Sequence, residues 1–212
     1  MPFEILTTQL SVEVTTVVTF VLTLALAAVM TQRYLSKKAR SLMFWCAAVW
    51  IFAVAVFLEI LFAYGLNSEP LISAYLLLVA ILVELLALGS MELIKSKRAR
   101  ELYGAFAVLS TILLIYSLSA SRMGNMLTDY IVYGNLPLSV AITSSLITFP
   151  AAAIIVAIAA KSYLVRRSNK LLSIIAGVVI VSVAGTLYIV QFPALLYISE
   201  FIGILALWYG FI

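Results

Sequence analysis

The Lys and Arg residues of this chain are gathered at three places, each between long apolar segments. Twelve of the thirteen lie in clusters around 33–40, 95–100 and 161–170, and the alternate connections carry only Arg122. Basic residues concentrated in every second loop are typical of a membrane protein whose basic loops face the cytoplasm. The pattern predicts that the amino terminus lies outside and the carboxyl terminus inside the cytoplasmic membrane of a cell.

The composition agrees with a chain that is solvated by lipid. Hydrophobic residues make up 65% and charged residues 10% of the 212 residues, which is too apolar for a soluble fold of this size. A helix needs about 20 apolar residues to cross a bilayer. We therefore predict an all-α integral membrane protein with one seven-helix membrane domain over 1–212. The predicted spans are 10–32, 42–64, 71–94, 102–120, 139–163, 171–191 and 194–212.

The sequence also contains a weak internal repeat at an offset of 129 residues. Ten of 27 positions are identical when 34–60 is set against 163–189 without a gap. After a slightly shorter loop, Pro70 falls opposite Pro193, and each is expected to open a helix, where a missing backbone N–H costs little. The prediction is a parallel 3+1+3 plan, with repeat one at about 10–94, a connector helix at about 102–120 and repeat two at about 139–212.

In organisation alone, this plan resembles the three-plus-one-plus-three arrangement of SWEET-type sugar carriers, PnuC-type vitamin carriers and trimeric intracellular cation channels. Parallel repeats of this kind place a pseudo-twofold axis along the membrane normal, with a pathway or site commonly between the halves. The proline tetrad and the glycine triplet of those families are absent from the sequence. The resemblance therefore carries no functional residue to this chain.

Three glutamates lie deep in predicted spans. A charged group at the bilayer centre costs about 3 kcal/mol or more unless it is protonated, paired or hydrated, so each is a functional candidate. Glu59 and Glu200 are both expected about 9–10 Å below the outer boundary, where they could face each other. Glu84 is expected in the inner half of its helix. Each could line a proton or cation pathway, or could simply hold the bundle together by hydrogen bonds to neighbouring helices.

The fifth predicted helix carries further candidates. Ser144, Ser145 and Thr148 precede Pro150, which cannot donate to the carbonyl of Leu146, so a kink with nearby hydroxyls is expected. Such a break either lies on a transport pathway or serves ordinary packing. The loop at about 121–138 is expected to form a short interfacial helix or a plain cap over the bundle mouth.

Missing residue types exclude several chemistries. The chain has no histidine, one cysteine and one aspartate, Asp129, in a loop. Imidazole-ligated metals, Ser/His catalysis and intramembrane aspartyl dyads are therefore out of reach. We expect no enzyme activity, no cofactor, no metal site and no nucleic-acid partner. The expected partners are the bilayer, anionic lipid at the basic loops, a small solute or cation, and a second copy or a membrane complex.

The function expected from these patterns is that of a small-solute or cation permease or channel-like transporter. Its pathway would run between the halves and use Glu59, Glu200 and Glu84. The alternative is a seven-helix sensor or an accessory subunit of a larger membrane complex, which would act through partners at the basic loops. A polar interior reaching the glutamates favours transport, and a dry, packed centre favours a subunit.

Overall fold

The computed structural model of the chain describes residues 2–66, 68–122, 127–128, 131–132, 136–189 and 193–211. Within these ranges the side chains are described from Glu13 onward, except those of 127–128, 131–132, 166, 171, 181–189 and 193–198. All statements about side chains below concern this part of the chain.

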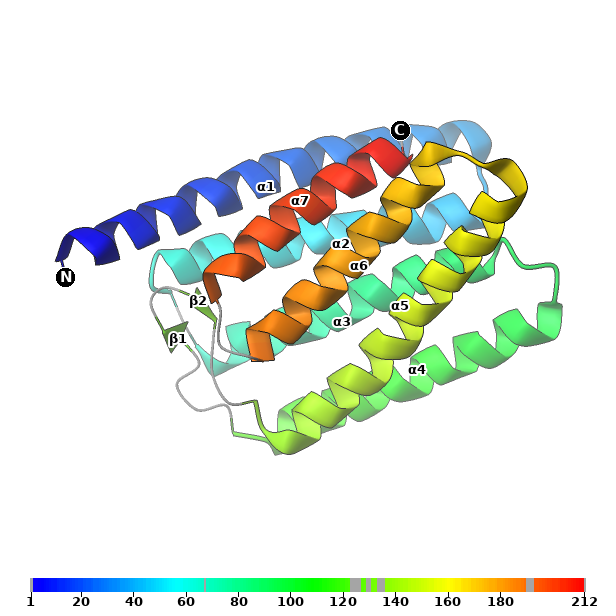
Figure 1. Ribbon diagram of the computed structural model, residues 1–212. Helices are drawn as coiled ribbons and strands as arrows, with labels where there is room; N and C mark the ends of the chain where they lie inside the picture. The colour runs from blue at the N-terminus through cyan, green and yellow to red at the C-terminus, as the bar shows by residue number, and fades with distance from the viewer. Residues whose placement is uncertain are drawn as a thin grey trace.

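The described residues form a bundle of seven long helices (Figure 1). These are α1 (Pro2–Lys37), α2 (Arg40–Ala63), α3 (Glu69–Met91), α4 (Lys97–Ala120), α5 (Leu138–Arg166), α6 (Asn169–Ile189) and α7 (Pro193–Phe211). Two short strands, β1 (Leu127–Thr128) and β2 (Ile131–Val132), pair antiparallel between α4 and α5. The helical fold class is as predicted. Of the two alternatives for this loop, a short interfacial helix or a plain cap, the helix is not formed by these four residues, which pair as strands, and β2 contacts α2.

Five of the helices are long and apolar enough to cross a membrane within their described residues. They are Glu13–Lys37, Arg40–Ala63, Glu69–Met91, Lys97–Ala120 and Leu138–Val165. The described apolar part of α7, Ser199–Phe211, is shorter than a full span. The length and composition of these helices indicate an integral membrane protein, and a count of seven spans remains a prediction.

The ends of the helices follow local sequence signals. Pro70 stands in the first turn of α3, and Pro193 is the first residue of α7, as predicted. Gly65, with φ of 77°, follows α2 in a left-handed conformation that a residue without a Cβ adopts at little cost. Gly65 and Pro70 thus mark the end of α2 and the start of α3, which run antiparallel (Figure 1).

Six of the helices are arranged in a ring. Each helix packs on the next in the order α1, α2, α3, α5, α6, α7, and α7 returns to α1. Helix α4 lies outside the ring against α3 and α5, at the edge of the bundle in Figure 1. Exchanging α1–α3 with α5–α7 would preserve this order of neighbours, as the predicted repeat requires. Superposition of the two halves remains a prediction.

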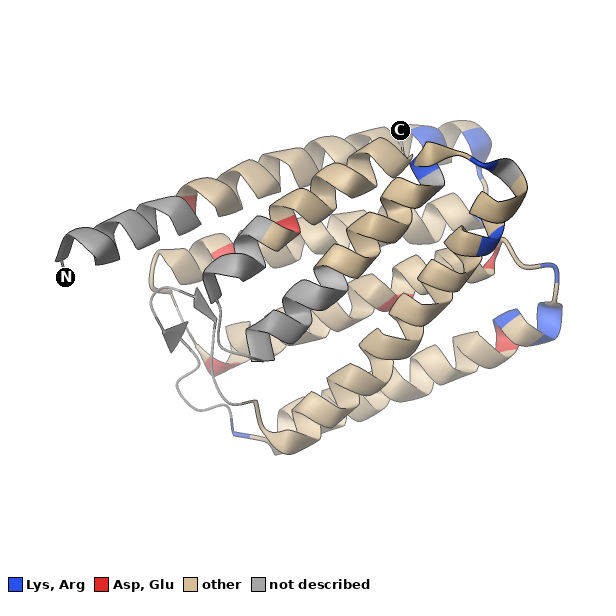
Figure 2. Ribbon diagram, viewed as in Figure 1, with Lys and Arg blue, Asp and Glu red and all other residues tan. Residues whose placement is uncertain are grey.

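Basic side chains collect at one end of the bundle. Figure 2 shows most of the Lys and Arg residues there, where α1, α3 and α5 end, and Arg122 follows α4 at the opposite end. We call this the basic end, and the opposite end the far end. Two ion pairs belong to it, from Lys97 to Glu101 at 3.5 Å and from Arg100 to Glu92 at 3.2 Å. Which side of a membrane the basic end faces remains a prediction.

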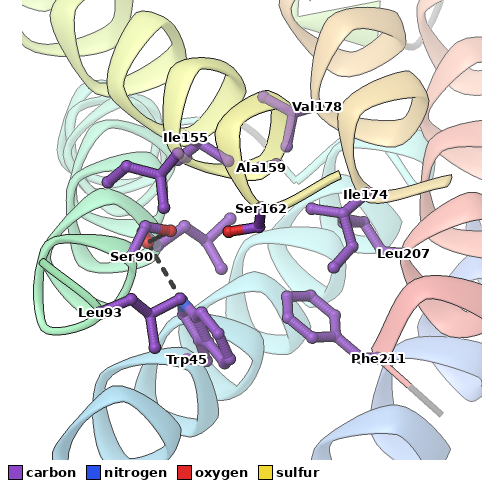
Figure 3. A pocket seen from close by; sticks show the side chains of 12 residues that line it. Trp45, Ser90, Leu93, Ile155, Ala159, Ser162, Ile174, Val178, Leu207 and Phe211 are labelled. Atoms are coloured by element: carbon purple, nitrogen blue, oxygen red, sulfur yellow. Dashed lines mark hydrogen bonds between the residues drawn. The ribbon is translucent and has the colours of Figure 1, made fainter. Parts of the chain in front are cut away.

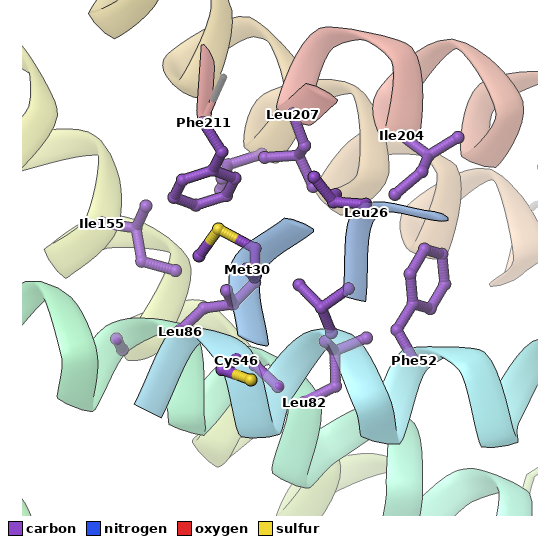
Figure 4. Close-up of a cluster of buried hydrophobic side chains, with 14 of the residues drawn as sticks. Leu26, Met30, Cys46, Phe52, Leu82, Leu86, Ile155, Ile204, Leu207 and Phe211 are labelled. Atoms are coloured by element: carbon purple, nitrogen blue, oxygen red, sulfur yellow. The ribbon is translucent and has the colours of Figure 1, made fainter. Parts of the chain in front are cut away.

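The interior is apolar and closely packed. Side chains from α1, α2, α3 and α7 point toward one another around Leu26, Phe52, Leu82 and Ile204 (Figure 4). A second apolar cluster nearer the far end joins α2, α3, α4 and α5 around Phe62 and neighbours. Outward-facing residues of α4 are also apolar and broadly exposed, which is the pattern expected of a surface that faces lipid.

Candidate functional site

Glu59 lies inside the bundle rather than on its lipid-facing surface. Its side chain is 2% exposed, on the half of α2 nearer the far end. The hydroxyl of Tyr75, on α3, donates a hydrogen bond of 2.7 Å to Oε1 of Glu59. The ring of Tyr75 is held edge-on against Phe62, with centroids 5.7 Å apart. The position of the Glu59 carboxyl is therefore fixed from two helices.

Glu200 reaches the same place from α7. It is 8% exposed, and its carboxyl group lies within hydrogen-bonding reach of the Glu59 carboxyl. Ionised carboxylates only accept hydrogen bonds, so a bond between the two groups requires at least one proton. The structure thus brings together the two glutamates that the sequence places at similar depth.

One oxygen of this pair is left without an ordinary partner. Oε2 of Glu59 is buried and receives no hydrogen bond from a hydroxyl or N–H group of the described residues. No Lys or Arg of the described residues forms an ion pair with Glu59 or Glu200. A buried polar atom in this state calls for a bound proton, water or ion.

An apolar layer separates the carboxyl pair from the basic end. Phe52 lies seven residues from Glu59 on α2, and Ile204 lies four residues from Glu200 on α7, both toward the basic end. Both side chains are buried in the central cluster of Figure 4. At 1.5 Å per residue this layer begins about 6–10 Å from the carboxyls. The pair is therefore closed off from that end.

Glu84 occupies a different place, at the contact of α3 with α4. It is 4% exposed, and both of its oxygens have hydroxyl neighbours on α4. Oε2 accepts a hydrogen bond of 2.6 Å from Thr111, and Oε1 lies 3.0 Å from Oγ of Ser110. Ser110 has one proton and also lies 2.8 Å from the carbonyl of Phe106, so it cannot donate to both. This geometry ties two helices together and does not include the Glu59–Glu200 pair.

The candidates on α5 do not join the glutamates. The hydroxyl of Ser144 donates to the carbonyl of Ala141 in its own helix at 3.2 Å. Ser145 and Thr148 are half-buried, and α5 runs without interruption through Pro150 from Leu138 to Arg166. A role of these residues in a transport pathway remains a prediction. No hydrogen bond between described side chains connects them to a carboxyl group.

Sequence reasoning missed three buried threonines on α1. Thr16, Thr19 and Thr23 are exposed by only 1%, 2% and 0%. Their spacing of three and four residues places them on one helix face. That face packs against the rest of the ring, because α1 contacts α2 and α7, the helices that carry the carboxyl pair. Polar residues at helical spacing in an otherwise apolar span were the available signal.

The structure has a small cavity at the basic end, away from the carboxyl pair. Its volume is about 40 Å³, and its lining includes Trp45, Ser90, Ser162, Leu207 and Phe211 (Figure 3). The indole N–H of Trp45 donates to the carbonyl of Leu86 at 3.2 Å along one wall. A space of this size holds a water molecule or two, which is too little for an organic solute.

Within the described residues, no three His, Cys, Asp or Glu side chains converge to form a metal site of the ordinary kind. Comparison of the chain with models of protein families, with curated proteins and with solved structures gives no match. The arrangement of side chains is therefore the basis for a functional assignment.

Proposed function

We propose that this chain is a small membrane permease in which the Glu59–Glu200 pair carries the transported or coupling proton or cation. One observation carries the proposal: two buried carboxyl groups meet inside an apolar bundle without a basic partner among the side chains that the structure describes. Removing carboxyl groups from water costs several kcal/mol by the usual scales, about 3 kcal/mol for each ionised acid at mid-membrane. A structural link between α2 and α7 could be made by apolar packing without this cost.

The pair also lies where a carrier needs it. Glu59 belongs to the first three helices and Glu200 to the last three, so relative motion of the two groups of helices changes the contact. The apolar layer around Phe52 and Ile204 supports a closed state, in which the pair has no route to the basic end. Loosening that layer would connect the pair to the cavity beside Trp45.

Purified protein in liposomes tests this function. A membrane potential is imposed with a potassium gradient and valinomycin, and a trapped pH dye and a sodium dye report flux. We expect flux above that of protein-free liposomes, reduced at least about tenfold by Glu59→Gln or Glu200→Gln. Glu101→Gln is the matched control, because Glu101 is exposed and pairs with Lys97 at the basic end.

A result of equal flux in the wild type and both pair variants would contradict the proposal. Circular dichroism and gel filtration on the same samples show whether a variant has folded. Gln preserves the size of the side chain and a hydrogen-bond acceptor for Tyr75, so the fold should survive.

An accessory subunit or sensor is the second candidate, and the closed centre favours it. The cavity of about 40 Å³ is small for a solute pathway, and the central cluster is apolar. This function predicts no flux from the purified chain under any gradient. It also predicts that the protein is recovered from its native membrane in a complex with other chains.

A further inference from the structure

The two carboxyl groups of the Glu59–Glu200 pair have different surroundings. Glu59 is 2% exposed, and its Oε1 accepts the hydrogen bond of 2.7 Å from Tyr75. Its other oxygen, Oε2, is buried and receives no hydrogen bond from a hydroxyl or N–H group of the described residues. Glu200 is 8% exposed and lies within hydrogen-bonding reach of Glu59. The Glu59 carboxyl therefore lacks one donor, and its acidic neighbour can supply it.

A proton on Glu200 satisfies this arrangement. The protonated carboxyl of Glu200 would donate to Oε2 of Glu59, while Tyr75 donates to Oε1. Each oxygen of Glu59 would then accept one hydrogen bond. Hydrogen bonds to an ionised acceptor are stronger than those to a neutral one, so the negative charge is better placed on the carboxyl with the additional donor. The charge thus belongs to Glu59 and the proton to Glu200.

The donor that distinguishes the two acids is held firmly in place. Tyr75 is 7% exposed, and its ring stands at 87° to that of Phe62, which is completely buried. Tyr75 belongs to α3, whereas Phe62 and Glu59 both belong to α2. The edge-on contact and the hydrogen bond therefore hold one side chain of α3 against two positions of α2, and the hydroxyl stays directed at Oε1.

The same surroundings favour a proton over a metal cation. Hard metal cations take about six or more oxygen ligands. The described contacts place at the pair the oxygens of the two carboxyl groups and the hydroxyl of Tyr75. Phe62 and Ile204, each about one turn from one of the two acids, belong to packed apolar clusters. A proton between Glu59 and Glu200 needs only one oxygen from each.

We propose that the ion of this site is a single proton, held on Glu200 and shared with Glu59, and that Tyr75 is the positioning residue that makes Glu59 its acceptor. This inference rests on the proposed function, since it names the ion that the carboxyl pair carries. Transfer of the proton from Glu200 to Oε2 of Glu59 moves the negative charge to Glu200, so the pair keeps a charge of −1 and no further reactant is needed. The proton thereby passes from the last three helices to the first three.

Infrared spectroscopy of the full chain in liposomes at neutral pH locates the proton. A protonated carboxyl group has a carbonyl band that is separate from the bands of a carboxylate. In difference spectra, Glu200→Gln should remove the band of the pair. Glu59→Gln should only shift it, because an amide oxygen replaces the carboxylate as acceptor. Glu84→Gln is the control, since Glu84 is also buried but bonds to Thr111 on α4, and it should leave this band unchanged.

Two tyrosine variants test the positioning role. Tyr75→Phe removes the hydroxyl and keeps the ring that packs on Phe62. Without the donor at Oε1 the proton should move toward Glu59, so the band of the pair should shift, and proton flux into liposomes should fall about tenfold, the effect of one hydrogen bond to a charged group. Tyr103→Phe is the matched control: Tyr103 is also 7% exposed, and its hydroxyl has no hydrogen-bond partner among the described residues. It should change neither the band nor the flux.

Several outcomes would overturn the inference. One is a band that disappears in Glu59→Gln and persists in Glu200→Gln. Another is a separate band removed by each variant, which would mean that both acids hold protons. An unchanged band and unchanged flux in Tyr75→Phe would reject the positioning role, and this comparison stands even if Glu200→Gln fails to fold.

The failure of this inference is distinguishable from that of the permease. Flux that requires sodium in place of choline, and still depends on Glu59 and Glu200, would keep the permease and replace the proton by a metal cation. Conversely, the expected band of Glu200 in a protein that shows no flux would support the proton site and reject the permease.

Discussion

Lys38 and Arg167 adopt the same left-handed backbone conformation, with φ of 47° and 50°, at positions 129 residues apart. Each ends a helix in the same way: the N–H of Lys38 donates to Tyr34 and that of Arg167 to Tyr163, both at 2.7 Å. The sequence repeat has the same offset and pairs these two tyrosines. Local backbone geometry is thus equal at the two sites, which is what a duplicated unit would produce.

Glycine at either position should stabilise the protein. A side chain in the left-handed region costs about 1 kcal/mol, and glycine avoids that cost. We expect Lys38→Gly and Arg167→Gly each to raise the free energy of unfolding by about 0.5–1 kcal/mol. Thermal melts in detergent measure it. The reverse change, Gly65→Ala at φ of 77°, should lower the melting temperature. Opposite signs for Lys38→Gly and Arg167→Gly would argue against equivalent caps.

A methyl group at Gly89 should disturb the wall of the cavity. A Cβ there would lie 2.5 Å from Nε1 of Trp45, so the indole must move and lose its bond to the Leu86 carbonyl. We expect Gly89→Ala to destabilise the fold by about 1–3 kcal/mol and to shift tryptophan emission. Gly104→Ala is the control, because nothing lies within 4 Å of its Cβ position and alanine favours helix. Equal stability of the two variants would refute the close packing of Trp45 on α3.

The hydroxyl pair on α4 should contribute to stability through Glu84. Glu84→Ala leaves a cavity and removes the acceptor of the Thr111 hydroxyl, whereas Ser110 can still donate to the carbonyl of Phe106, at an expected cost of about 2–4 kcal/mol. Glu84→Gln keeps an acceptor and should cost less. A double-mutant cycle of Glu84→Ala with Thr111→Val should give a coupling of about 1–2 kcal/mol. Zero coupling would show that the contact at 2.6 Å contributes nothing.

Impermeant thiol labelling tests the orientation of the bundle. In a Cys46→Ala background, single cysteines at Ser36, Ser96 and Asn169 should all react from the side of the basic loops, the cytoplasm, and Ser68 from the opposite side. The first three belong to the basic end and the last to the start of α3. Intact cells and inside-out vesicles distinguish the two sides, and lysed cells give the control for total reactivity. Labelling of any one of the first three from the side of Ser68 would reject the predicted topology.

Hydropathy was sufficient to predict the helices, because a helix surrounded by lipid must be apolar along its whole length, and this leaves a continuous apolar run in the sequence. Helix order around the ring depends on packing between side chains, which no span encodes by itself. The meeting of Glu59 with Glu200 was therefore only a possibility in the sequence, and the bond from Tyr75 was not foreseen.

The threonines of α1 show a second limit. Thr16, Thr19 and Thr23 are ordinary in an apolar helix, since each can return its proton to its own backbone. Only the contact of α1 with both α2 and α7 gives them a possible role. Glu84 shows the converse: its depth suggested a pathway, but its two oxygens lie against the hydroxyls of Ser110 and Thr111 on α4.

The place of α4 outside the ring has a mechanical consequence. The first and last triplets of helices touch along two seams, α3 with α5 and α1 with α7, and α4 packs across the first of these only. The α3–α5 seam is therefore held by a third helix, and the α1–α7 seam is not. Movement of the two triplets against each other would then be a rotation about a hinge at α3 and α5. In that motion the helices separate first along α1 and α7, on the side of Thr16, Thr19 and Thr23.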